Sequence, residues 1–387
     1  MTLKATIFTF EYPPNYYGGV GIHVQYLTQK LSEKINVEIR CPYNNVKDKT
    51  EKIGNITLRW LATSSKKFEN PVEKVYDVMN TDRKMAELPV DGNIIHTHTW
   101  YAAHAGVLAK TFWNKPLIVT THSLEPRRPW KEEQLQLGYR LSSYLERTAL
   151  IEADHIIAVS AFMKDDIQKI FDIRSNKITA IPNGIDIQKY RRKTDSTFLR
   201  QNNIRKPYVL FVGRLSRQKG VFDLVDASRY FNDNIQTVIV TGKEDTPGLT
   251  TELKNKIDSA PNKNNILWLN KMFTEEQLIY LYSSAETLVC PSIYEPFGIV
   301  NLEAMACETP VVATSVGGIP EIVVHNNTGY LVKKNEIKKL ADRINIIVED
   351  EQLREKFGTN SRRRVEKYFT WQKVADRTLR VYEKIKS

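Results

Sequence analysis

The chain has 387 residues, 41% of them hydrophobic and 26% charged, with a formal net charge of +11. These proportions exclude a disordered or fibrous chain, and the length exceeds what one ordinary hydrophobic core supports. No run approaches the roughly 20 apolar residues that span a bilayer, and no export signal precedes the first strand. We therefore expect a two-domain cytoplasmic protein without integral membrane association.

Short apolar runs alternate with longer amphipathic segments along the first half of the chain. The first strand is predicted at 5–10, a helix at 19–34 and a second strand at 37–40. Further strands are predicted at 94–98, 117–121, 155–159 and 177–181. Because each run is nearly continuous in Val, Ile and Leu, the pattern indicates parallel strands that are buried on both faces.

The alternation of apolar and amphipathic segments stops at 182–186 and does not resume within the polar stretch 188–206, which indicates a domain boundary. Strands are again predicted at 208–212, 237–241, 266–269, 287–291 and 311–314. The predicted fold class is α/β, with two doubly wound Rossmann-like domains at 1–185 and 186–369. Both sheets are expected to turn the carboxyl ends of their strands toward a central cleft, where open parallel sheets bind ligands.

A glycine-rich loop follows the first predicted strand. Gly18, Gly19 and Gly21 stand at the start of the predicted helix. Glycines let a ligand approach the backbone closely, and the amides of a helix N-terminus attract anions. A glycine pair also serves tight packing of a helix on a strand, so the loop alone leaves both interpretations open.

Two cations follow the first strand of the second domain. Arg214 and Lys219 stand at its carboxyl end, beside Gly220. They suit a diphosphate, because a hydrogen bond between charged groups contributes about 1.5 to 3 kcal/mol. Solvated surface cations are the alternative interpretation.

The strongest local signal is the segment 294–306, which follows the strand predicted at 287–291. A turn here leads into a helix, so amides at the helix start are expected to point outward without partners. These amides belong to Gly298, Ile299 and Val300. Glu295 precedes the helix, and Glu303 lies within it, where a carboxylate can accept hydrogen bonds from sugar hydroxyls. The loop 316–321 follows the next strand and is expected to flank the same pocket.

Histidines supply the remaining candidates of the first domain. His122 follows the strand predicted at 117–121 and is expected to face the cleft, with a core or capping role as the alternative. His96 and His98 lie two positions apart, but no carboxylate or cysteine cluster accompanies them. Three cysteines, at positions 41, 290 and 307, are far apart and are expected to be reduced core residues. The sequence thus assigns no metal and no cofactor.

The segment 333–387 carries 16 basic and 9 acidic residues. A basic helix can bind nucleic acid or anionic lipid, but a solvated helix face is the simpler interpretation. The sequence lacks the interleaved aromatic and basic residues that bind single-stranded nucleic acid, so no nucleic-acid partner is expected.

Taken as an ordered set, the glycine loop, the two cations and the segment 295–303 resemble the retaining family 4 glycosyltransferases of the GT-B fold. The resemblance covers nearly the whole chain. Segments 96–102, 122–131 and 139–143 resemble glycogen synthases, and most of all the short branch that includes maltose-1-phosphate synthases. Tyr17 and Thr99 depart from the longer bacterial glycogen synthases, which place a lysine and an aspartate there.

The resemblance implies a role for each candidate residue. It implies that the donor diphosphate is held by Arg214 and Lys219, the ribose by Glu303, and the transferred sugar by Glu295 with the amides of residues 298–300. It also implies that His122 contacts the primary hydroxyl of that sugar. The final segment, 370–387, is expected to cross back onto the first domain.

The implied activity is a metal-independent, retaining transfer of glucose from ADP-glucose to the non-reducing end of an α-1,4-glucan. One alternative is an α-maltose-1-phosphate synthase, in which Arg127, Arg128 and Lys131 bind the phosphate of glucose 1-phosphate. These three residues are equally interpreted as a solvated basic loop. The sequence also leaves open a hexosyltransferase that uses a UDP-sugar, a hydrolase that uses Glu295 and Glu303, and a polyanion-binding module that senses a nucleotide sugar. A homo-oligomer is compatible with each of these functions.

Overall fold

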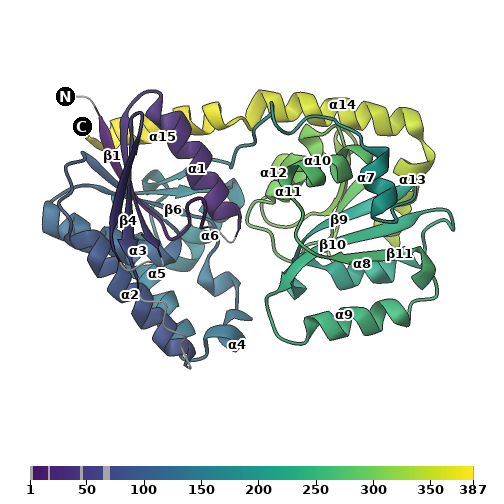
Figure 1. The fold of residues 1–387 in the computed structure, drawn as a ribbon, viewed down its shortest axis with the longest axis horizontal. Helices are drawn as coiled ribbons and strands as arrows, with labels where there is room; N and C mark the ends of the chain where they lie inside the picture. Colours follow the sequence, from purple (N-terminus) through teal and green to yellow (C-terminus); the bar gives the residue numbers. More distant parts are fainter. Residues whose placement is uncertain (1–2, 16–17, 44–46, 64–69, 387) are drawn as a thin grey trace. The chain divides into compact units, whose positions relative to one another are not determined.

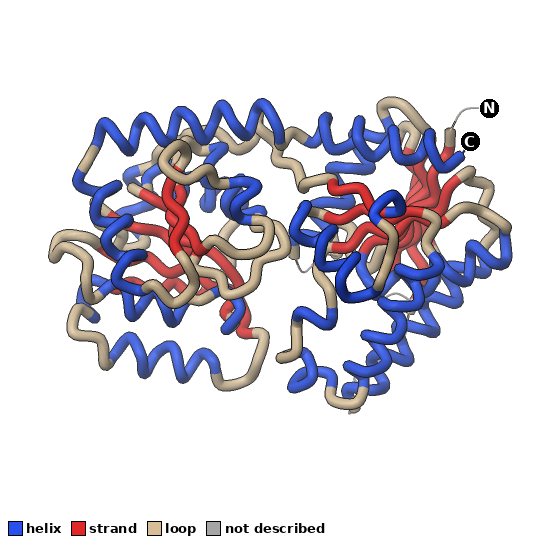
Figure 2. The backbone as a smooth tube through the Cα atoms, turned by 180° about the vertical axis from the view of Figure 1, so that it is seen from behind, coloured by secondary structure: helices blue, strands red, loops and turns tan. Residues whose placement is uncertain are grey.

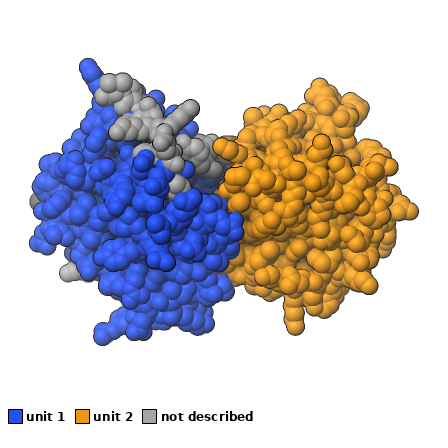
Figure 3. Space-filling model, turned by 90° about the horizontal axis from the view of Figure 1, so that it is seen from below, with its two compact units in different colours: residues 1–183, 371–387 blue, residues 184–370 orange. Residues whose placement is uncertain are grey.

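The structure, a computed structural model, describes residues 3–15, 18–43, 47–63 and 70–386 (Figure 1). The chain divides into two compact units, coloured separately in Figure 3. Unit 1 comprises Met1–Asn183 with Trp371–Ser387, and unit 2 comprises Gly184–Thr370. In each unit, helices flank a sheet of mainly parallel strands (Figure 2). The predicted fold class of two doubly wound α/β domains is confirmed.

Within the described residues, unit 1 has an eight-stranded sheet in the order β3-β4-β2-β1-β5-β6-β7-β8, parallel except for the antiparallel pair β3 and β4. The strands are β1 (Lys4–Phe8), β2 (Asn36–Tyr43), β3 (Lys49–Ile53), β4 (Ile56–Ala62), β5 (Ile94–His98), β6 (Leu117–Thr121), β7 (His155–Ala158) and β8 (Ile178–Ala180). The α-helices are α1 (Gly19–Ser32), α2 (Pro71–Glu87), α3 (Thr99–Trp113), α4 (Lys131–Leu135), α5 (Gly138–Glu152), α6 (Ala161–Phe171) and α15 (Trp371–Lys386).

The described part of unit 2 has a six-stranded parallel sheet in the order β11-β10-β9-β12-β13-β14. Its strands are β9 (Tyr208–Leu215), β10 (Gln236–Glu244), β11 (Ile266–Asn270), β12 (Thr287–Cys290), β13 (Val311–Thr314) and β14 (Gly329–Val332). The α-helices are α7 (Ser196–Gln201), α8 (Val221–Ser228), α9 (Leu249–Asp258), α10 (Glu275–Ser284), α11 (Ile299–Ala306), α12 (Ile319–Ile322), α13 (Ile337–Glu349) and α14 (Glu351–Tyr368).

The structure corrects the predicted elements in two respects. Strands β3, β4 and β14 were not expected, and β9 continues through Arg214 rather than ending before it. The five residues of β3, Lys-Thr-Glu-Lys-Ile, are half-buried or exposed. An edge strand of this kind carries charge instead of an apolar run, so it lacks the signal by which buried strands are recognised.

The last helix, α15, is packed on unit 1. The ring of Trp371 stacks on Tyr26 of α1, with centroids 5.5 Å apart, and Tyr382 bonds through its hydroxyl to Nδ1 of His96 at 2.6 Å. Since these partners are buried or half-buried, α15 is part of the core that supports β5. Within the described residues, no helix is long and apolar enough to cross a membrane.

Several arginines of the basic tail have structural partners. Arg362 on α14 donates to the carbonyl oxygens of Ile187, Tyr190 and Ala306. Arg364 donates to the carbonyl oxygens of residues 321 and 322. These two guanidinium groups satisfy carbonyl oxygens of neighbouring segments, so part of the charge of the tail has a structural role.

Arg40 on β2 holds the end of α2 in unit 1. Its fully buried guanidinium donates to the carbonyl oxygens of Met85, Leu88 and Pro89 at 2.6 to 2.8 Å. It also pairs with the buried carboxylate of Glu38 at 2.9 Å. One side chain thereby satisfies carbonyls at the C-terminus of a helix and compensates a buried charge.

We predict that Arg40→Met lowers the free energy of unfolding of unit 1 by about 3 to 5 kcal/mol, because it leaves buried acceptors without their donor. Arg59→Met is the matched control, since Arg59 pairs with the same Glu38 at 3.1 Å but is 36% exposed; it is expected to cost less than about 1 kcal/mol. Urea unfolding followed by tryptophan fluorescence reports mainly on unit 1, which holds five of the six tryptophans. Equal unfolding midpoints for the two variants would contradict this account of Arg40.

Candidate functional site

The candidate residues of unit 2 lie at the carboxyl ends of β9 and β12, which are neighbours in the sheet. The chain reaches β10 on one side of β9 and β12 on the other, so the strand order reverses here. Loops after neighbouring parallel strands diverge at such a point and leave room for a ligand. The topology thus brings Arg214 at the end of β9, Lys219 after β9 and the segment 294–306 to one edge of the sheet.

Lys219 and Glu295 form a partly buried ion pair at this edge. Nζ of Lys219 lies 2.6 Å from Oε2 of Glu295, and the side chains are 17% and 7% exposed. The hydroxyl of Ser292 donates to the same carboxylate oxygen at 3.2 Å. Arg214 is exposed and has no ion-pair partner among the described residues. One cation is therefore committed to Glu295, while the other is available for an anionic ligand.

Glycines bring the loops around Glu295 into direct backbone contact. Gly317 has φ +57°, and a Cβ there would lie 1.8 Å from the carbonyl oxygen of Glu295, which also accepts a bond from the amide of Gly318 at 3.0 Å. Gly220 has φ +69°, and a Cβ there would lie 1.9 Å from the carbonyl oxygen of Pro291. No larger residue fits at either position without displacing these loops. The loop at 316–321 thus contacts Glu295, as its place after β13 predicts.

Helix α11 begins at this edge and is not capped by any described side chain. Its N-cap residue is Gly298, with φ +101°, so the amides of Ile299 and Val300 open the helix. Glu303, further along α11, is 7% exposed and accepts a bond from the hydroxyl of Tyr282 at 2.7 Å. A second tyrosine, Tyr190, bonds more weakly at 3.5 Å. Burial raises the pKa of Glu303 to about 7.

The glycine loop of unit 1 differs from the prediction. The carboxylate of Glu11 accepts bonds from the amides of Gly18 at 3.2 Å and Gly21 at 3.3 Å. The N-terminus of α1 is thus capped by the chain's own anion, and two of the amides expected to meet a ligand have a partner. Gly19 is exposed, and Tyr17 lies outside the described residues. A carboxylate ten positions before Gly21 gives no local signal of this cap.

His122 lies in a group of histidines that the sequence did not bring together. Nε2 of His122 is 3.2 Å from Nδ1 of His98, and its ring lies 4.6 Å from that of His23 on α1. His23 bonds through Nδ1 to the side-chain oxygen of Asn183, 160 positions away, at 2.8 Å. Burial lowers the pKa of all three histidines, that of His23 to about 4. The three imidazoles are therefore neutral at pH near 7.

Two of the three basic residues after His122 are paired with acidic side chains. Arg127, 44% exposed, binds Asp166 through Nε at 2.9 Å and through a second nitrogen. Arg128, only 12% exposed, lies 3.6 Å from a carboxylate oxygen of Glu125. Lys131 begins α4 and is half-buried. Arg127 and Arg128 are thus ordered by their surroundings, and the role of all three residues in acceptor binding stays a prediction.

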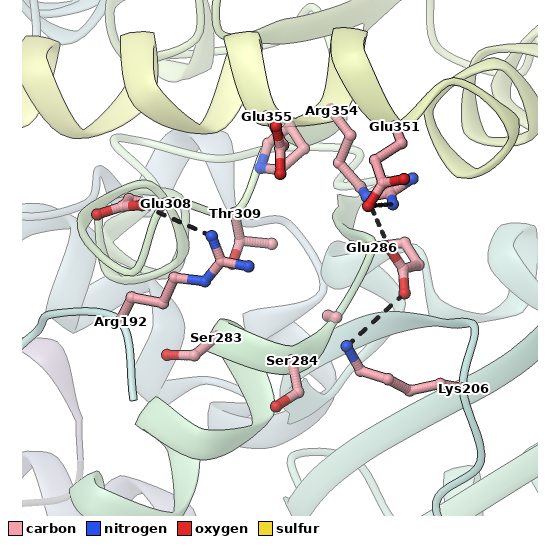
Figure 4. A pocket seen from close by; sticks show the side chains of 12 residues that line it. Arg192, Lys206, Ser283, Ser284, Glu286, Glu308, Thr309, Glu351, Arg354 and Glu355 are labelled. Atoms are coloured by element: carbon pink, nitrogen blue, oxygen red, sulfur yellow. Dashed lines mark ion pairs between the residues drawn. The ribbon is translucent and has the colours of Figure 1, made fainter. Parts of the chain in front are cut away.

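A cavity of about 290 Å³ lies elsewhere on unit 2 (Figure 4). It is lined at the amino ends of strands, by Lys206 before β9, Glu286 before β12 and Thr309 before β13. Its charges satisfy one another, since Glu286 pairs with Arg354 at 2.8 Å and with Lys206 at 3.9 Å. The cavity therefore lies at the opposite edge of the sheet from Glu295 and offers a ligand few free charges.

Comparison with known proteins covers both units. Residues 17–189 match the family model described as Glycosyltransferase Family 4, and residues 195–364 match that described as Glycosyl transferases group 1. An alpha-maltose-1-phosphate synthase of Mycolicibacterium smegmatis is 36% identical over 99% of this chain and 100% of its own length. A glycogen synthase of Mycobacterium tuberculosis is 27% identical over 98% of this chain and 94% of its own. The solved sucrose-phosphate synthase of Thermosynechococcus elongatus has a TM-score of 0.82 at 23% identity, over 99% of this chain and 98% of that one, and so shares the fold.

We predict that Glu303 makes unit 2 less stable as pH rises. Because its pKa is about 7 in the folded chain and 4.5 without burial, the folded state binds more protons in between. The free energy of unfolding should therefore fall by about 3 kcal/mol between about pH 4.5 and pH 8. Glu303→Gln, which cannot ionise, should lack this fall and unfold at a higher temperature than the parent chain near pH 8. Calorimetry at several pH values tests this, and parallel pH profiles for the two proteins would contradict it.

Proposed function

This chain belongs to the family 4 glycosyltransferases of the GT-B fold, and we propose that it transfers glucose from ADP-glucose to glucose 1-phosphate, giving α-maltose 1-phosphate. The observation that carries the proposal is the full-length similarity to the maltose-1-phosphate synthase of Mycolicibacterium smegmatis, at 36% identity. Similarity to the glycogen synthase is lower, at 27%. We therefore propose glucose 1-phosphate as the acceptor, in preference to the α-1,4-glucan that the sequence analysis favoured.

In the proposed reaction, the bond between the anomeric carbon and the donor diphosphate breaks, and the diphosphate leaves with the electron pair. The 4-hydroxyl of glucose 1-phosphate attacks the same face of the sugar, which retains the configuration. Its proton passes to the departing phosphate oxygen, so the products are maltose 1-phosphate and ADP. The step requires stabilisation of negative charge on the leaving group.

Unit 2 holds the groups that are suited to that charge. Arg214 is exposed and unpaired among the described residues, and Lys219, which follows β9, keeps further donors on the ammonium group that bonds to Glu295. The uncapped start of α11 adds amides and the positive end of a helix dipole. We assign the donor diphosphate to these groups and the ribose to Glu303, whose carboxylate accepts hydrogen bonds.

Glu295 is suited to steadying the donor sugar. Its carboxylate is bonded to Lys219 at 2.6 Å and to Ser292 at 3.2 Å, and these two contacts hold it in one position. A hydrolase would need Glu295 and Glu303 to flank one glycosidic bond as acid and nucleophile. In this structure Glu303 is bonded to two tyrosines instead, which favours transfer over hydrolysis.

Unit 1 supplies candidates for the sugar and for the acceptor phosphate. We assign His122 to the primary hydroxyl of the transferred sugar, because its neutral imidazole can donate or accept a hydrogen bond. We assign the phosphate of glucose 1-phosphate to Arg127, Arg128 and Lys131. Arg127 offers an exposed planar guanidinium whose orientation Asp166 fixes, and such a group matches phosphate geometry.

The acceptor is tested by offering glucose 1-phosphate and glycogen side by side, each with ADP-glucose and with UDP-glucose. We expect maltose 1-phosphate from ADP-glucose, identified by mass spectrometry, with the α configuration of the new bond shown by NMR. Lengthening of glycogen in preference to this product would restore the glucan as acceptor. Shortening of glycogen would indicate a hydrolase, and no sugar transfer to either acceptor would refute the proposal.

We predict that Arg214→Ala lowers kcat/KM by about a hundredfold to a thousandfold, because a preset cation is lost from the leaving group. Arg217→Ala is the matched control, since Arg217 lies three positions away but pairs with Glu252 at 2.7 Å, and it should keep near-normal activity. Lys219→Ala should also abolish turnover, but it leaves Glu295 without its partner, so Arg214 is the cleaner test. Similar activity in the Arg214 and Arg217 variants would contradict the assignment.

A further inference from the structure

Three histidines converge in unit 1 from different parts of the chain. His23 lies on α1, His98 ends β5, and His122 follows β6, the strand paired with β5. One ring nitrogen from each lies within 4.8 Å of the others. The nearest pair, Nδ1 of His98 and Nε2 of His122, is 3.2 Å apart. The seven histidines of the chain are spread over 303 positions, from 23 to 325, so no local pattern indicates this group.

Two of these rings have an unsatisfied nitrogen. Nε2 of His23 is buried and has no hydrogen-bond partner among the described residues. Nε2 of His98 is unsatisfied too, but the nitrogen of His98 that lies nearest His122 is Nδ1. Nδ1 of His23 bonds to the side-chain oxygen of Asn183 at 2.8 Å, so this nitrogen carries the proton and leaves the lone pair on Nε2. Histidines that bind metals in proteins have the same arrangement, with the other ring N–H held by an oxygen acceptor.

We propose that His23, His98 and His122 form a binding site for a divalent transition-metal ion of the zinc class. Zinc–nitrogen bonds of 2.0 to 2.1 Å place two tetrahedral ligands about 3.3 Å apart, close to the separation of the nearest pair. The ring nitrogens of the three histidines lie within 4.8 Å of one another. To reach the ligand separation of about 3.3 Å, the most distant pair must therefore move closer by at most about 1.5 Å. Three neutral imidazoles with one further position suit zinc, whereas magnesium and calcium ions prefer oxygen ligands.

The surroundings favour occupation of the site. His23 and His98 are buried, but His122 is half-buried, so an ion can enter on its side. The rings of Trp371 and His23 are nearly perpendicular with centroids 5.3 Å apart, and this contact limits the movement of the His23 ring.

Binding of the ion would block catalysis. This consequence rests on the proposed function, which assigns His122 to the transferred sugar: a His122 nitrogen that is bound to zinc cannot bond to a sugar hydroxyl. The ion therefore acts as an inhibitor and not as a cofactor. Zinc ions at one equivalent should reduce sugar transfer, magnesium ions should not, and EDTA should restore the activity.

Cobalt(II) titration of the full chain, followed by visible absorption, tests the site without any need for activity. We expect the intense bands of tetrahedral cobalt to saturate at one equivalent and to disappear when zinc is added. His23→Gln and His98→Gln should each abolish the bands, whereas His104→Gln, which changes a half-buried histidine outside the group, should retain them. Asn183→Ala should weaken binding by about tenfold to a hundredfold, because it removes the acceptor that orients His23.

Circular dichroism and thermal unfolding show whether each variant is folded. If His98→Gln does not fold, the two separate variants His23→Gln and Asn183→Ala still test the site. Absence of a one-equivalent tetrahedral spectrum in the parent chain, or its persistence in folded His23→Gln, would overturn the proposed site. Cobalt binding without any inhibition by zinc would overturn the competition with sugar. Absence of all sugar transfer would refute the proposed function. The cobalt titration would still decide whether the metal site exists, because it does not depend on activity.

Discussion

The ion pair between Lys219 and Glu295 is the constraint on which the candidate site of unit 2 depends. It joins the loop after β9 to the loop after β12 through two side chains that are mostly shielded from water. A buried carboxylate without a partner would be costly, so the lysine fixes the position of Glu295 as well as its charge. The glycines at 220 and 317 let the same loops touch through their backbones. These loops are therefore held in place by contacts within unit 2, which is the preorganisation that the proposed transfer needs.

The two units use their helix N-termini differently. In unit 1, Glu11 already occupies two amides at the start of α1. In unit 2, no described side chain caps α11, and Gly298 leaves its first turn open. Both loops contain glycines after a strand, so their local sequences suggested the same anion site. At α1 the carboxylate of Glu11 bonds to the helix amides, whereas at α11 the neighbouring carboxylate of Glu295 bonds to Lys219 and Ser292 instead. The start of α11 therefore stays open for the proposed diphosphate.

The sequence predicted the buried framework well, because continuous apolar runs are a local signal. Strands β5, β6 and β13 have the predicted bounds, and the others that were predicted differ by a few residues at their ends. The exposed strand β3 was missed because its charged residues resemble a loop. The sequence indicated the candidate residues in the loops that follow strands. It did not indicate the contact of His23 with Asn183, because these residues are 160 positions apart. Such contacts follow from topology, which no local pattern records.

The acceptor question turns on the surroundings of two arginines. A neutral glucan needs hydroxyl partners and flat apolar surface, whereas a sugar phosphate needs a cation that stays accessible. Arg128 is 12% exposed and close to Glu125, so most of its charge is compensated within unit 1. Arg127 is also paired, through two nitrogens with Asp166, but its side chain stays 44% exposed. A guanidinium whose side-chain entropy is already lost binds phosphate at lower cost than a mobile one, and this favours the sugar phosphate as acceptor.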